Sequence, residues 1–418
     1  MPNHATGFEI RDIVLETISG AEIDIHLLID EFNVYESLFN ATISADFVID
    51  DANNVIKNFP ITGHEYLRFS FKTPGQNWVK CRLRVYKIGQ RQLERERRQI
   101  FILYCIDNTD FINAQVRVSK AYKQKLISDI ANDIQTTYLQ SSFINIETTK
   151  NLHHIITPYW TPSKTISFLA SRANSVKYQG SNYVYFETVD GFSFCSIESL
   201  VDKQSPIKNY IHQPANVRKD NPVGYKPRTL DTDYVALQSF EIKNNFDTME
   251  NCMYGMYTSR LLWHDIQNKQ FGINDFDYPS SYSNYKHVEA NTVQGGSSYL
   301  WTPKSDYNQQ PYGELKVYPI GLPGQQNYVI QWMQQRISQM QQIQNIRILA
   351  TIPGDSTRRS GDLVSITLPS PEAPINDQQP IDSYLTNRYL VTGVRHVLNR
   401  KQFVTHLELT KDSIFKSY

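Results

Sequence analysis

The sequence predicts an α+β protein that is mostly antiparallel β. Near both ends of the chain, apolar and polar residues alternate over strand-length stretches, which is typical of a sheet with one buried face. In several segments between these ends the apolar residues recur with a period of 3.6, which indicates helices. The 418 residues also include 26 tyrosines and 20 phenylalanines, and aromatic side chains favour strands.

Length and composition narrow the classes of function. The 42 basic and 42 acidic residues balance, so the composition gives no basic footprint for nucleic acid or an anionic membrane. The start at Met1-Pro2-Asn3-His4 does not resemble a signal peptide, and no run of about 18 apolar residues occurs, so we expect no stable membrane insertion. The scattered cysteines predict free, mostly buried thiols in a reducing cytoplasm (Cys81, Cys105, Cys195, Cys252).

The first 110 residues are predicted to be antiparallel strands. From Ile23 to Ile29 every second residue is apolar, and from Val79 to Val85 apolar residues alternate with basic ones. The charged run from Arg91 to Arg98 precedes the apolar strand from Ile100 to Ile106, which predicts a long hairpin with a charged tip. A weak pattern from Asp51 to Asn58 could form one short helix.

Near residue 112 the apolar period changes from 2 to 3.6. A first helix capped by Ser119 is predicted from a stripe of apolar residues (Tyr122, Leu126, Ile127, Ile130, Ala131, Ile134, Tyr138). A second helix begins at Thr161-Pro162, a cap residue followed by a first-turn proline, and its buried face is Ile166, Leu169, Ala170 and Ala173. Strands at Tyr183–Phe186 and Phe192–Cys195 then flank Asp190-Gly191, a hairpin turn signal.

A connector rich in proline and asparagine follows from Ser205 to about Asp231, and β character resumes at Val235–Ile242. Residues 264–328 are rich in Tyr, Asn, Gln, Gly and Pro and show little periodicity. One amphipathic helix is predicted around Trp332, Met333, Ile337, Met340 and Ile343. The chain closes with four strands, the last two joined by a turn at Asn399-Arg400-Lys401 (Ile346–Ile352, Leu363–Leu368, Tyr389–Leu398, Phe403–Leu409). No exact internal repeat is visible.

Several loose motifs follow one another along nearly the whole chain. They are Tyr35-Glu36-Ser37-Leu38-Phe39, Phe47-Val48-Ile49-Asp50-Asp51, Pro60-Ile61-Thr62-Gly63-His64-Glu65, the Thr161-Pro162 helix with the Tyr183–Phe194 hairpin, Ile352-Pro353-Gly354-Asp355, Ser360–Ile366, Tyr389–His396 and Thr405–Leu409. In this order they resemble the central baseplate hub protein of contractile-tailed bacteriophages, of the T-even type. That family is related to the hub domains of type six secretion spike proteins. Residues 264–328 match no part of the family.

The resemblance implies a homotrimer in which each chain contributes two tube-like β-barrel domains. Three chains then form a pseudo-sixfold ring that joins a sixfold tail tube to a threefold central spike and encloses part of the DNA passage. The implied organisation is a first tube-like β domain at 1–112, an α+β domain at 113–205, a connector at 206–231, a second tube-like β domain at 232–263 and 340–412, an insertion with the amphipathic helix at 264–339 and a tail at 413–418.

Further expectations follow from the same resemblance. The chain is implied to be a structural protein of the virion tail baseplate, assembled in the host cytoplasm, and not an enzyme. Its partners are the tail tube protein, the central spike protein and other baseplate proteins, without sequence-specific nucleic-acid binding. Because the chain stops at Tyr418 without the repeating β-prism of a fused spike, the spike is expected to be a separate chain.

Catalytic motifs such as H-E-x-x-H, G-x-S-x-G, G-x-x-x-x-G-K and G-x-G-x-x-G are missing. We therefore predict no catalytic, cofactor-binding or metal-binding residues and no cofactor. His153 and His154 lack a third ligand at a recognisable spacing and, as strand neighbours, point to opposite faces. His396 and His406 lie on adjacent strands of the closing hairpin, where a packed or hydrogen-bonded pair is favoured over a site.

Other candidates have a structural and a functional interpretation. Glu36 and Glu65 could form the carboxylate pair of a glycoside hydrolase, although capping of backbone groups or pairing with basic groups at strand ends is favoured. The Arg91–Arg98 run is a solvated hairpin tip or an inter-subunit patch. Aromatic residues in the insertion could stack on sugars, but contact with another tail protein is favoured (Tyr278, Tyr282, Tyr285, Tyr299, Trp301, Tyr307, Tyr312). The segments Thr386–Arg388 and Pro369–Pro380 could dock a partner or be plain connectors.

Three alternative functions stay open. A tail-associated cell-wall hydrolase would clear peptidoglycan in a zymogram, whereas a hub would not. A carbohydrate-binding host-recognition protein would bind glycans through residues 264–328. The hub of a phage-tail-like bacteriocin differs from a phage hub in gene neighbourhood, which the sequence does not contain.

Overall fold

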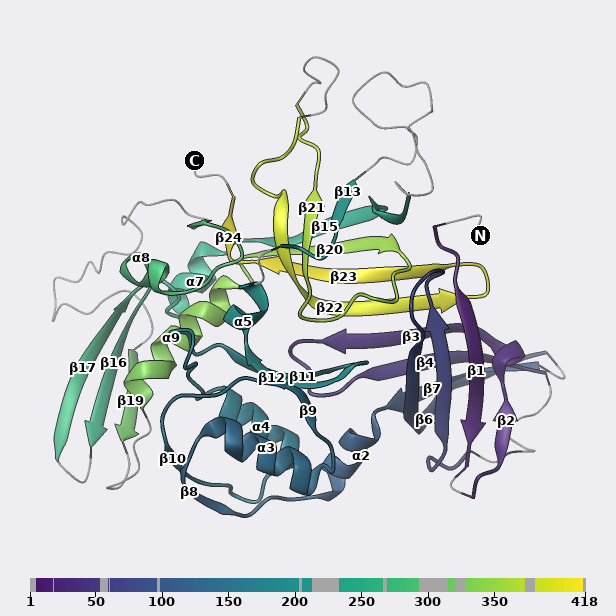
Figure 1. Ribbon diagram of the computed structural model, residues 1–418, viewed down its shortest axis with the longest axis horizontal. Coiled ribbons are helices and arrows are strands. Elements are labelled where there is room, and N and C mark those ends of the chain that lie inside the picture. The colour runs from purple at the N-terminus through teal and green to yellow at the C-terminus, as the bar shows by residue number, and fades with distance from the viewer. Residues whose placement is uncertain are drawn as a thin grey trace.

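The computed structural model describes residues 5–17, 19–52, 59, 61–95, 98–202, 205–212, 233–265, 269–292, 315–320, 328–372 and 380–415. Most strands belong to one fourteen-stranded sheet, which curls into two barrels that lie side by side (Figure 1). We call them the N-barrel and the C-barrel. The predicted fold class, α+β with mostly antiparallel β, is confirmed.

The N-barrel has the strand order β2-β1-β5-β6-β7-β4-β3. Its strands are β1 (Glu9–Glu16), β2 (Glu22–Asp24), β3 (Ile29–Ser37), β4 (Ser44–Asp51), β5 (Tyr66–Lys72), β6 (Val79–Arg95) and β7 (Arg98–Ile106). Phenylalanine rings fill its core, with Phe32 stacked on Phe47 at 5.1 Å and Phe69 edge-on to Phe47 at 5.1 Å. The predicted β6–β7 hairpin is confirmed.

The strand predicted from Ile23 to Ile29 is interrupted. A 3-10 turn, η1 (His26–Leu28), separates β2 from β3 and leaves the Leu27 side chain 86% exposed. The backbone N–H of Leu28 donates to the Ile25 carbonyl inside this turn, so these residues leave the ladder despite their alternating pattern.

The C-barrel has the strand order β14-β13-β21-β22-β23-β20-β15. Its strands are β13 (Asn209–His212), β14 (Ala236–Leu237), β15 (Ser239–Asn245), β20 (Ile346–Pro353), β21 (Leu363–Thr367), β22 (Asn387–Asn399) and β23 (Phe403–Lys411). Gln238 joins β14 to β15 and donates its N–H to the Thr351 carbonyl at 2.8 Å, which closes the barrel. The four predicted closing strands and their final turn are confirmed. Part of the predicted connector forms β13, and its residues 213–231 lie outside the described residues.

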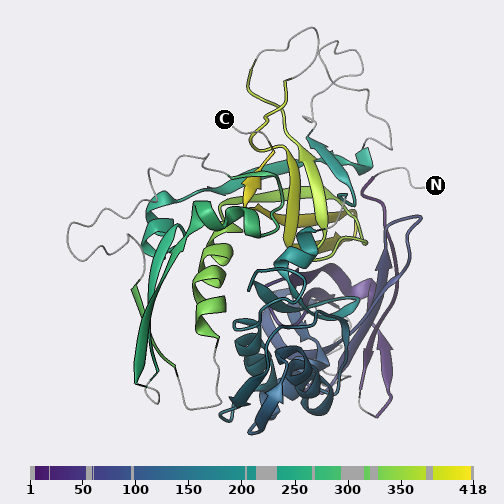
Figure 2. The same cartoon turned by 60° about the vertical axis from the view of Figure 1, so that its left-hand side comes forward.

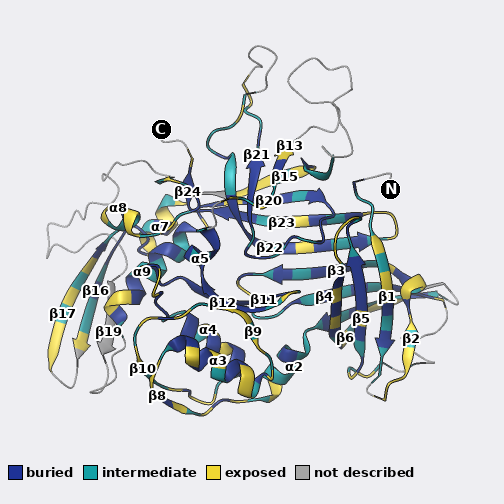
Figure 3. Cartoon of the chain, viewed as in Figure 1, coloured by how far each residue is buried: buried dark blue, intermediate teal, exposed yellow. Residues whose placement is uncertain are grey.

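The two barrels repeat one pattern. In both, the strands follow one another in the same neighbour order, so that β3, β4, β5, β6 and β7 correspond to β15, β20, β21, β22 and β23. They also share a bulge, because the register of β6 on β7 shifts between Val85 and Lys87, and that of β22 on β23 shifts between Val391 and Gly393. Figure 3 shows that buried and exposed residues alternate along the strands of both barrels. A barrel requires only this alternation of inward and outward side chains, so the two barrels can share a strand order without sharing a sequence repeat.

One ladder joins the barrels. Residues Glu31–Ser37 of β3 pair antiparallel with Gly393–Asn399 of β22. Beyond that ladder, Phe403 of β23 packs edge-on against Phe71 at 5.8 Å, and both it and Leu398 belong to the core of the N-barrel. The two ends of the chain are therefore one continuous structure.

An α+β unit follows the N-barrel. It contains α2 (Asn108–Gln115), β8 (Ala121–Lys125), α3 (Ile127–Tyr138), β9 (Phe143–Ile146), β10 (His153–Ile156), α4 (Pro162–Ala170), β11 (Tyr183–Thr188), β12 (Gly191–Ser196) and α5 (Ile197–Val201). The second predicted helix and the hairpin are confirmed. The first helix begins later than predicted, with Leu126 and not Ser119 at its N-cap, because Gln124 has a φ of 50° and Tyr122 lies on strand β8.

The insertion enters the C-barrel between β15 and β20. Its elements are α7 (Thr248–Met253), β16 (Thr258–Asp265), β17 (Gln270–Asp277), α8 (Tyr278–Ser281), η2 (Tyr282–Asn284), β18 (Asn291–Thr292), β19 (Leu315–Ile320) and α9 (Val329–Gln342), the predicted amphipathic helix. The start of β16 was predicted in the second tube-like domain, but β16 pairs with β17 and β19 in a separate sheet. The predicted tail contributes β24 (Ser413–Ile414), which pairs with β18.

Two further expectations concern helices. The weak helix from Asp51 to Asn58 falls mostly on residues 53–58, which lie outside them. No helix in the described ranges is long and apolar enough to span a membrane.

A glycine at the junction of the barrels gives a direct test of this packing. A Cβ at Gly354 would lie 2.1 Å from the Phe403 ring, so Gly354→Ala should destabilise the protein by about 1–3 kcal/mol. Gly393→Ala is the matched control, since its Cβ would meet no atom closer than 3.4 Å. Urea unfolding of both variants measures the difference, and equal stabilities would contradict the described packing of Phe403.

Candidate functional site

The feature that both ends of the chain build together is an eight-stranded run of the sheet. Its order is β15-β20-β23-β22-β3-β4-β7-β6, with the β3–β22 ladder in the middle. We call this run the wall. One side of the wall covers the cores of the two barrels, and the other side faces outward.

The outward face of the wall mixes apolar side chains such as Ile100, Ile102 and Leu349 with charged groups that are locally balanced. Arg347 on β20 pairs with Glu408 on β23 at 2.8 Å, and His406 lies 3.0 Å from the Thr351 hydroxyl. Nearer the middle, Arg395 donates to the Asn33 side chain at 3.1 Å. The face therefore combines both signs of charge in fixed contacts.

The N-barrel part of the face follows the same pattern. The Tyr35 hydroxyl donates to Asp46 at 3.3 Å, and burial together with this carboxylate raises the pKa of Tyr35 to about 12. Arg98 donates its Nε to Asp50 at 2.7 Å, and the arginine lowers the pKa of that carboxyl. Tyr35 and Arg395 lie opposite each other in the β3–β22 ladder, so one polar row crosses both barrels.

Both ends of the wall are edge strands. Within the described residues, β15 has a ladder partner on one side only, namely β20. At the other end, β5 pairs with β6 only as far as Arg84, so the second half of β6 has no described partner on that side. Exposed apolar side chains lie on both edges, with Leu93 75% exposed on β6 and Ile242 41% exposed on β15. Long edges of this kind are templates for strand pairing.

A buried glutamate fixes the end of β3 to two other parts of the chain. The Glu36 carboxylate accepts the Val189 N–H from the α+β hairpin and the Ser360 N–H from the C-barrel, both at 3.0 Å. Arg359 lies 4.0 Å from the same carboxylate and 2.9 Å from Asp190. The Glu36 side chain is fully buried, and this burial raises its pKa to about 7.

A second buried glutamate makes the opposite connection. Glu187 of the α+β hairpin accepts the Ile43 N–H from the β3–β4 turn at 2.9 Å. Burial, with a smaller contribution from Asp107, raises the pKa of Glu187 to about 9. The N-barrel and the α+β unit thus exchange carboxylates, and each one satisfies a backbone N–H of the other.

Further buried charged groups attach the insertion. Glu198 accepts the N–H groups of Gly180 and Lys286, and Asp412 accepts the Val288 N–H at 3.1 Å and faces His287 at 2.7 Å. Figures 1 and 2 show α9 between the small sheet of the insertion and the α+β unit. On this helix, Arg336 donates to three carbonyls of the α+β unit (Ala170, Ser181, Tyr183).

The predicted histidine candidates do not converge. His153 is buried, with its pKa lowered to about 4 by burial, and its ring lies edge-on to Tyr328 at 5.1 Å. His396 and His406 were expected as a pair, but they point to opposite faces of the sheet because their register partners differ by one residue. His396 lies in the N-barrel core between Phe71 and Phe403, whereas His406 lies on the outward face.

The acidic and basic candidates have structural contacts. Glu65 accepts the N–H groups of Thr62, Gly63 and His64, so the predicted capping role is confirmed. In the charged run, Arg91 donates to Gln99 at 2.9 Å, and the side chains at 94–97 lie outside the described residues.

The aromatic stretch and the two candidate docking segments are only partly described. Tyr278 is buried, and the partly buried Tyr282 stacks on His287 at 3.7 Å, so both rings have contacts within the chain. The remaining members beyond Tyr285 lie outside the described residues (Tyr299, Trp301, Tyr307, Tyr312). Arg388 is fixed by bonds to Glu289 and Val201, and of Pro369–Pro380 only residues 369–372 and 380 are described.

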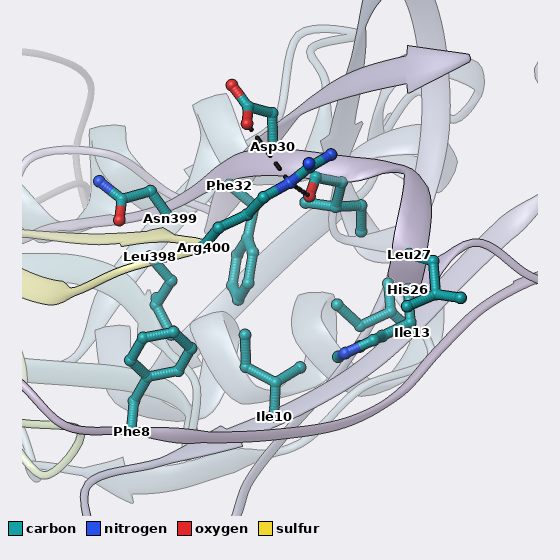
Figure 4. A pocket seen from close by; sticks show the side chains of 11 residues that line it. Phe8, Ile10, Ile13, His26, Leu27, Asp30, Phe32, Leu398, Asn399 and Arg400 are labelled. Carbon is teal, nitrogen blue, oxygen red and sulfur yellow. Dashed lines mark hydrogen bonds and ion pairs between the residues drawn. The ribbon is translucent and has the colours of Figure 1, made fainter. Parts of the chain in front are cut away.

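The described residues contain no cluster of three or more His, Cys, Asp or Glu that could hold a metal ion. All four cysteines are free and three are buried, as predicted. A cavity of about 350 Å³ opens between β1, η1 and the β22–β23 turn, with Phe8, Ile10 and Phe32 on its floor (Figure 4). Arg400 lies across its rim, 3.4 Å from Asp30.

The sequence reasoning missed the buried charged residues that join the units. Arg336 falls on the apolar stripe of α9, one turn after Trp332. Glu187 is a charged residue within β11, whose residues are all buried. A charge at an inward position of a periodic segment was the available signal for both.

The fold is shared with two tail proteins of known structure. The tail protein from Neisseria meningitidis MC58 matches with a TM-score of 0.56 and 12% identity over 98% of both chains. The 43 kDa tail protein of prophage MuSo2 from Shewanella oneidensis matches with a TM-score of 0.58 and 10% identity over 97% of this chain and 99% of that one.

A sequence relative makes the comparison more particular. The probable baseplate hub protein gp334 of Vibrio phage KVP40 is 21% identical over 400 residues, covering 92% of this chain and 90% of the relative. No protein-family model matches the chain. The resemblance to baseplate hub proteins that the sequence motifs indicate is confirmed.

The Glu36 junction gives a pH-dependent prediction. Its pKa is higher in the folded than in the unfolded chain, so its contribution to stability is present at low pH and is lost as the pH rises through about 7. Glu36→Gln removes this titration but weakens one hydrogen bond. The variant should be less stable than the natural protein at about pH 5 and should recover about 1–3 kcal/mol of that difference by about pH 8.

Urea unfolding across this pH range measures the recovery. Glu65→Gln is the control. Backbone hydrogen bonds lower the pKa of Glu65 despite its burial, so this carboxyl group does not titrate between about pH 5 and pH 8. A stability difference between Glu36→Gln and the natural protein that stays constant with pH would contradict the assignment.

Proposed function

We propose that the protein is a structural hub of a contractile-tail baseplate, a homotrimer that joins the tail tube to the central spike. The single observation that carries this proposal is the wall, in which two barrels of equal strand order form one sheet. Three such chains would give six equivalent barrels around one axis, matching a sixfold tube and a threefold spike. We propose the two barrels as the tube-like domains.

The ladder inside the chain supplies the template for contact between chains. β3 corresponds to β15 and β22 corresponds to β6, so the second half of β6 should meet β15 of the next copy as β22 meets β3. These are the two edge strands at the ends of the wall. Because the contact joins unlike surfaces in a head-to-tail manner, it closes into a ring when the rotation is one third of a turn.

The shared bulges fix the expected register. Aligning Val85 and Lys87 with Val391 and Gly393 places Lys87 at the position of Gly393, which pairs with Ser37. Through the pairing of β15 with β20, Phe246 corresponds to Ser37. Lys87 of one copy should therefore lie opposite Phe246 of the next.

The outward face of the wall suits a DNA passage. Basic groups that grip phosphates would slow a moving duplex, because each phosphate contact releases counterions and adds affinity. Here Arg347 and Arg98 are paired with carboxylates, and Arg395 is held by a side-chain amide. We propose that this face lines the lumen.

A non-enzymatic role is part of the proposal. The carboxylates that a hydrolase would use are engaged in structure, since Glu36 is fully buried between two backbone N–H groups and Glu65 caps a turn. Association with the tail tube, the central spike and other baseplate proteins, assembly in the host cytoplasm and location in the virion baseplate follow from the hub role.

Charges on the two edges should prevent assembly. Leu93→Lys combined with Ile242→Lys places lysines where strands must pair, and should convert a trimer into a monomer. Ile144→Lys is the matched control, because this exposed residue lies on β9, away from the wall. Size-exclusion chromatography with light scattering measures the mass, and circular dichroism checks the fold. A natural protein that stays monomeric, or a trimer that survives the double substitution, would contradict the proposal.

A further inference from the structure

The N-barrel carries a second organised surface, which begins on the wall's last strand, β6, and continues beyond the wall. β1, β5 and the first half of β6 form it, and Figure 1 shows β1 and β2 at the right-hand margin of the molecule, with the tip of the β22–β23 hairpin beside the start of β1. Six basic residues occupy this face, and four carboxylates lie among them (Arg11, Arg68, Lys72, Lys80, Arg82, Arg84; Glu9, Glu16, Glu22, Asp24). The six basic residues outnumber the four carboxylates, so this face has a small local excess of positive charge.

Aromatic rings hold three of the guanidinium groups in place. Arg11 lies 3.9 Å from the Trp78 ring centre, Arg82 lies 4.0 Å from that of Tyr66, and Arg84 lies 3.6 Å from that of Phe111. A guanidinium stacked on a ring keeps its N–H donors directed sideways and loses little entropy when it binds an anion. We call these three the stacked arginines.

Only part of the positive charge is compensated. Glu16 lies between Arg68 at 3.1 Å and Arg82 at 3.0 Å, and Glu9 pairs with Lys72 at 3.1 Å. In the described part of the chain, no carboxylate lies within ion-pair distance of Arg11, Lys80 or Arg84.

The arrangement does not favour the stability of the sheet. Arg68 and Arg82 are direct cross-strand partners, and like charges in such positions are destabilising. Glu16 contacts both arginines, and Glu22 lies 3.4 Å from Arg68. A face selected for folding alone would place opposite charges there, so the basic face is better explained by an external partner.

We infer that this face of the N-barrel binds an acidic polypeptide surface, with the stacked arginines as its main contacts. Carboxylates accept two parallel N–H bonds from a guanidinium, which rewards arginines held in a fixed orientation. The face continues from the outer side of β6 onto β5 and β1, so its partner lies on that side of the N-barrel. The inference does not depend on the trimer.

A binding assay with defined probes tests this inference. A short fluorescein-labelled poly-glutamate peptide is titrated with the full-length protein at low salt, and a labelled DNA duplex serves as the competing class of anion. We expect the peptide to bind with an affinity that falls as salt rises. Arg11→Gln, Arg82→Gln and Arg84→Gln together should weaken it by roughly tenfold or more.

Two further triple variants separate the effect of overall charge from that of the planar guanidinium groups. Arg117→Gln, Lys125→Gln and Lys150→Gln remove the same charge from exposed positions in or beside the α+β unit and should leave binding unchanged. Replacing the stacked arginines by lysines keeps the charge but loses the planar donors, and should bind more weakly than the natural protein. Circular dichroism confirms folding, and light scattering on the same samples reports the trimer independently.

Three results would overturn the inference. These are no peptide binding at low salt, equal loss in both glutamine variants, and lysine variants that bind as tightly as the natural protein. Tighter binding of the duplex through the same arginines would reassign the face to nucleic acid.

Discussion

The structure depends on the ladder between β3 and β22. It joins residues 31–37 to residues 393–399, so the closing hairpin must reach the first part of the chain before the core of the N-barrel is complete. The ladder also lets Phe403 and Leu398 of the hairpin enter the N-barrel core. Contacts between such distant parts of a chain carry a high entropic cost, which large buried surfaces on both sides offset.

Carboxylates at the ends of strands complete what the ladder begins. Where β3 ends, three parts of the chain meet, and their last N–H groups have no strand partner. Glu36 and Glu187 accept these groups, as Glu198 and Asp412 do where the insertion meets the rest of the chain. Such buried bonds are directional, so they fix the angles between units more strictly than apolar packing does. The proposed ring would need this rigidity to keep its register.

The sequence predicts local structure well and long-range pairing poorly. The β6–β7 hairpin, the proline-led α4 and the β11–β12 turn follow from alternation, capping and Asp190-Gly191, all of which act over a few residues. The late start of α3 and the detour at η1 were missed because the apolar period continues through them. Motif order indicated the hub family, but the equal strand order of the barrels, the joining ladder and the bridges of Glu187 and Arg336 arise only from the folded chain.

The central claim is that the ladder within one chain is repeated between chains. Cysteines at Lys87 and Phe246 test it most directly, because Lys87 lies on β6, Phe246 directly follows β15, and the two should face each other only across two copies. Under mild oxidation the double variant should form covalent dimers and trimers on a non-reducing gel, whereas each single variant and the pair Lys87→Cys with Ile144→Cys should not. Failure of the double variant to cross-link while the protein is trimeric in solution would contradict the claim.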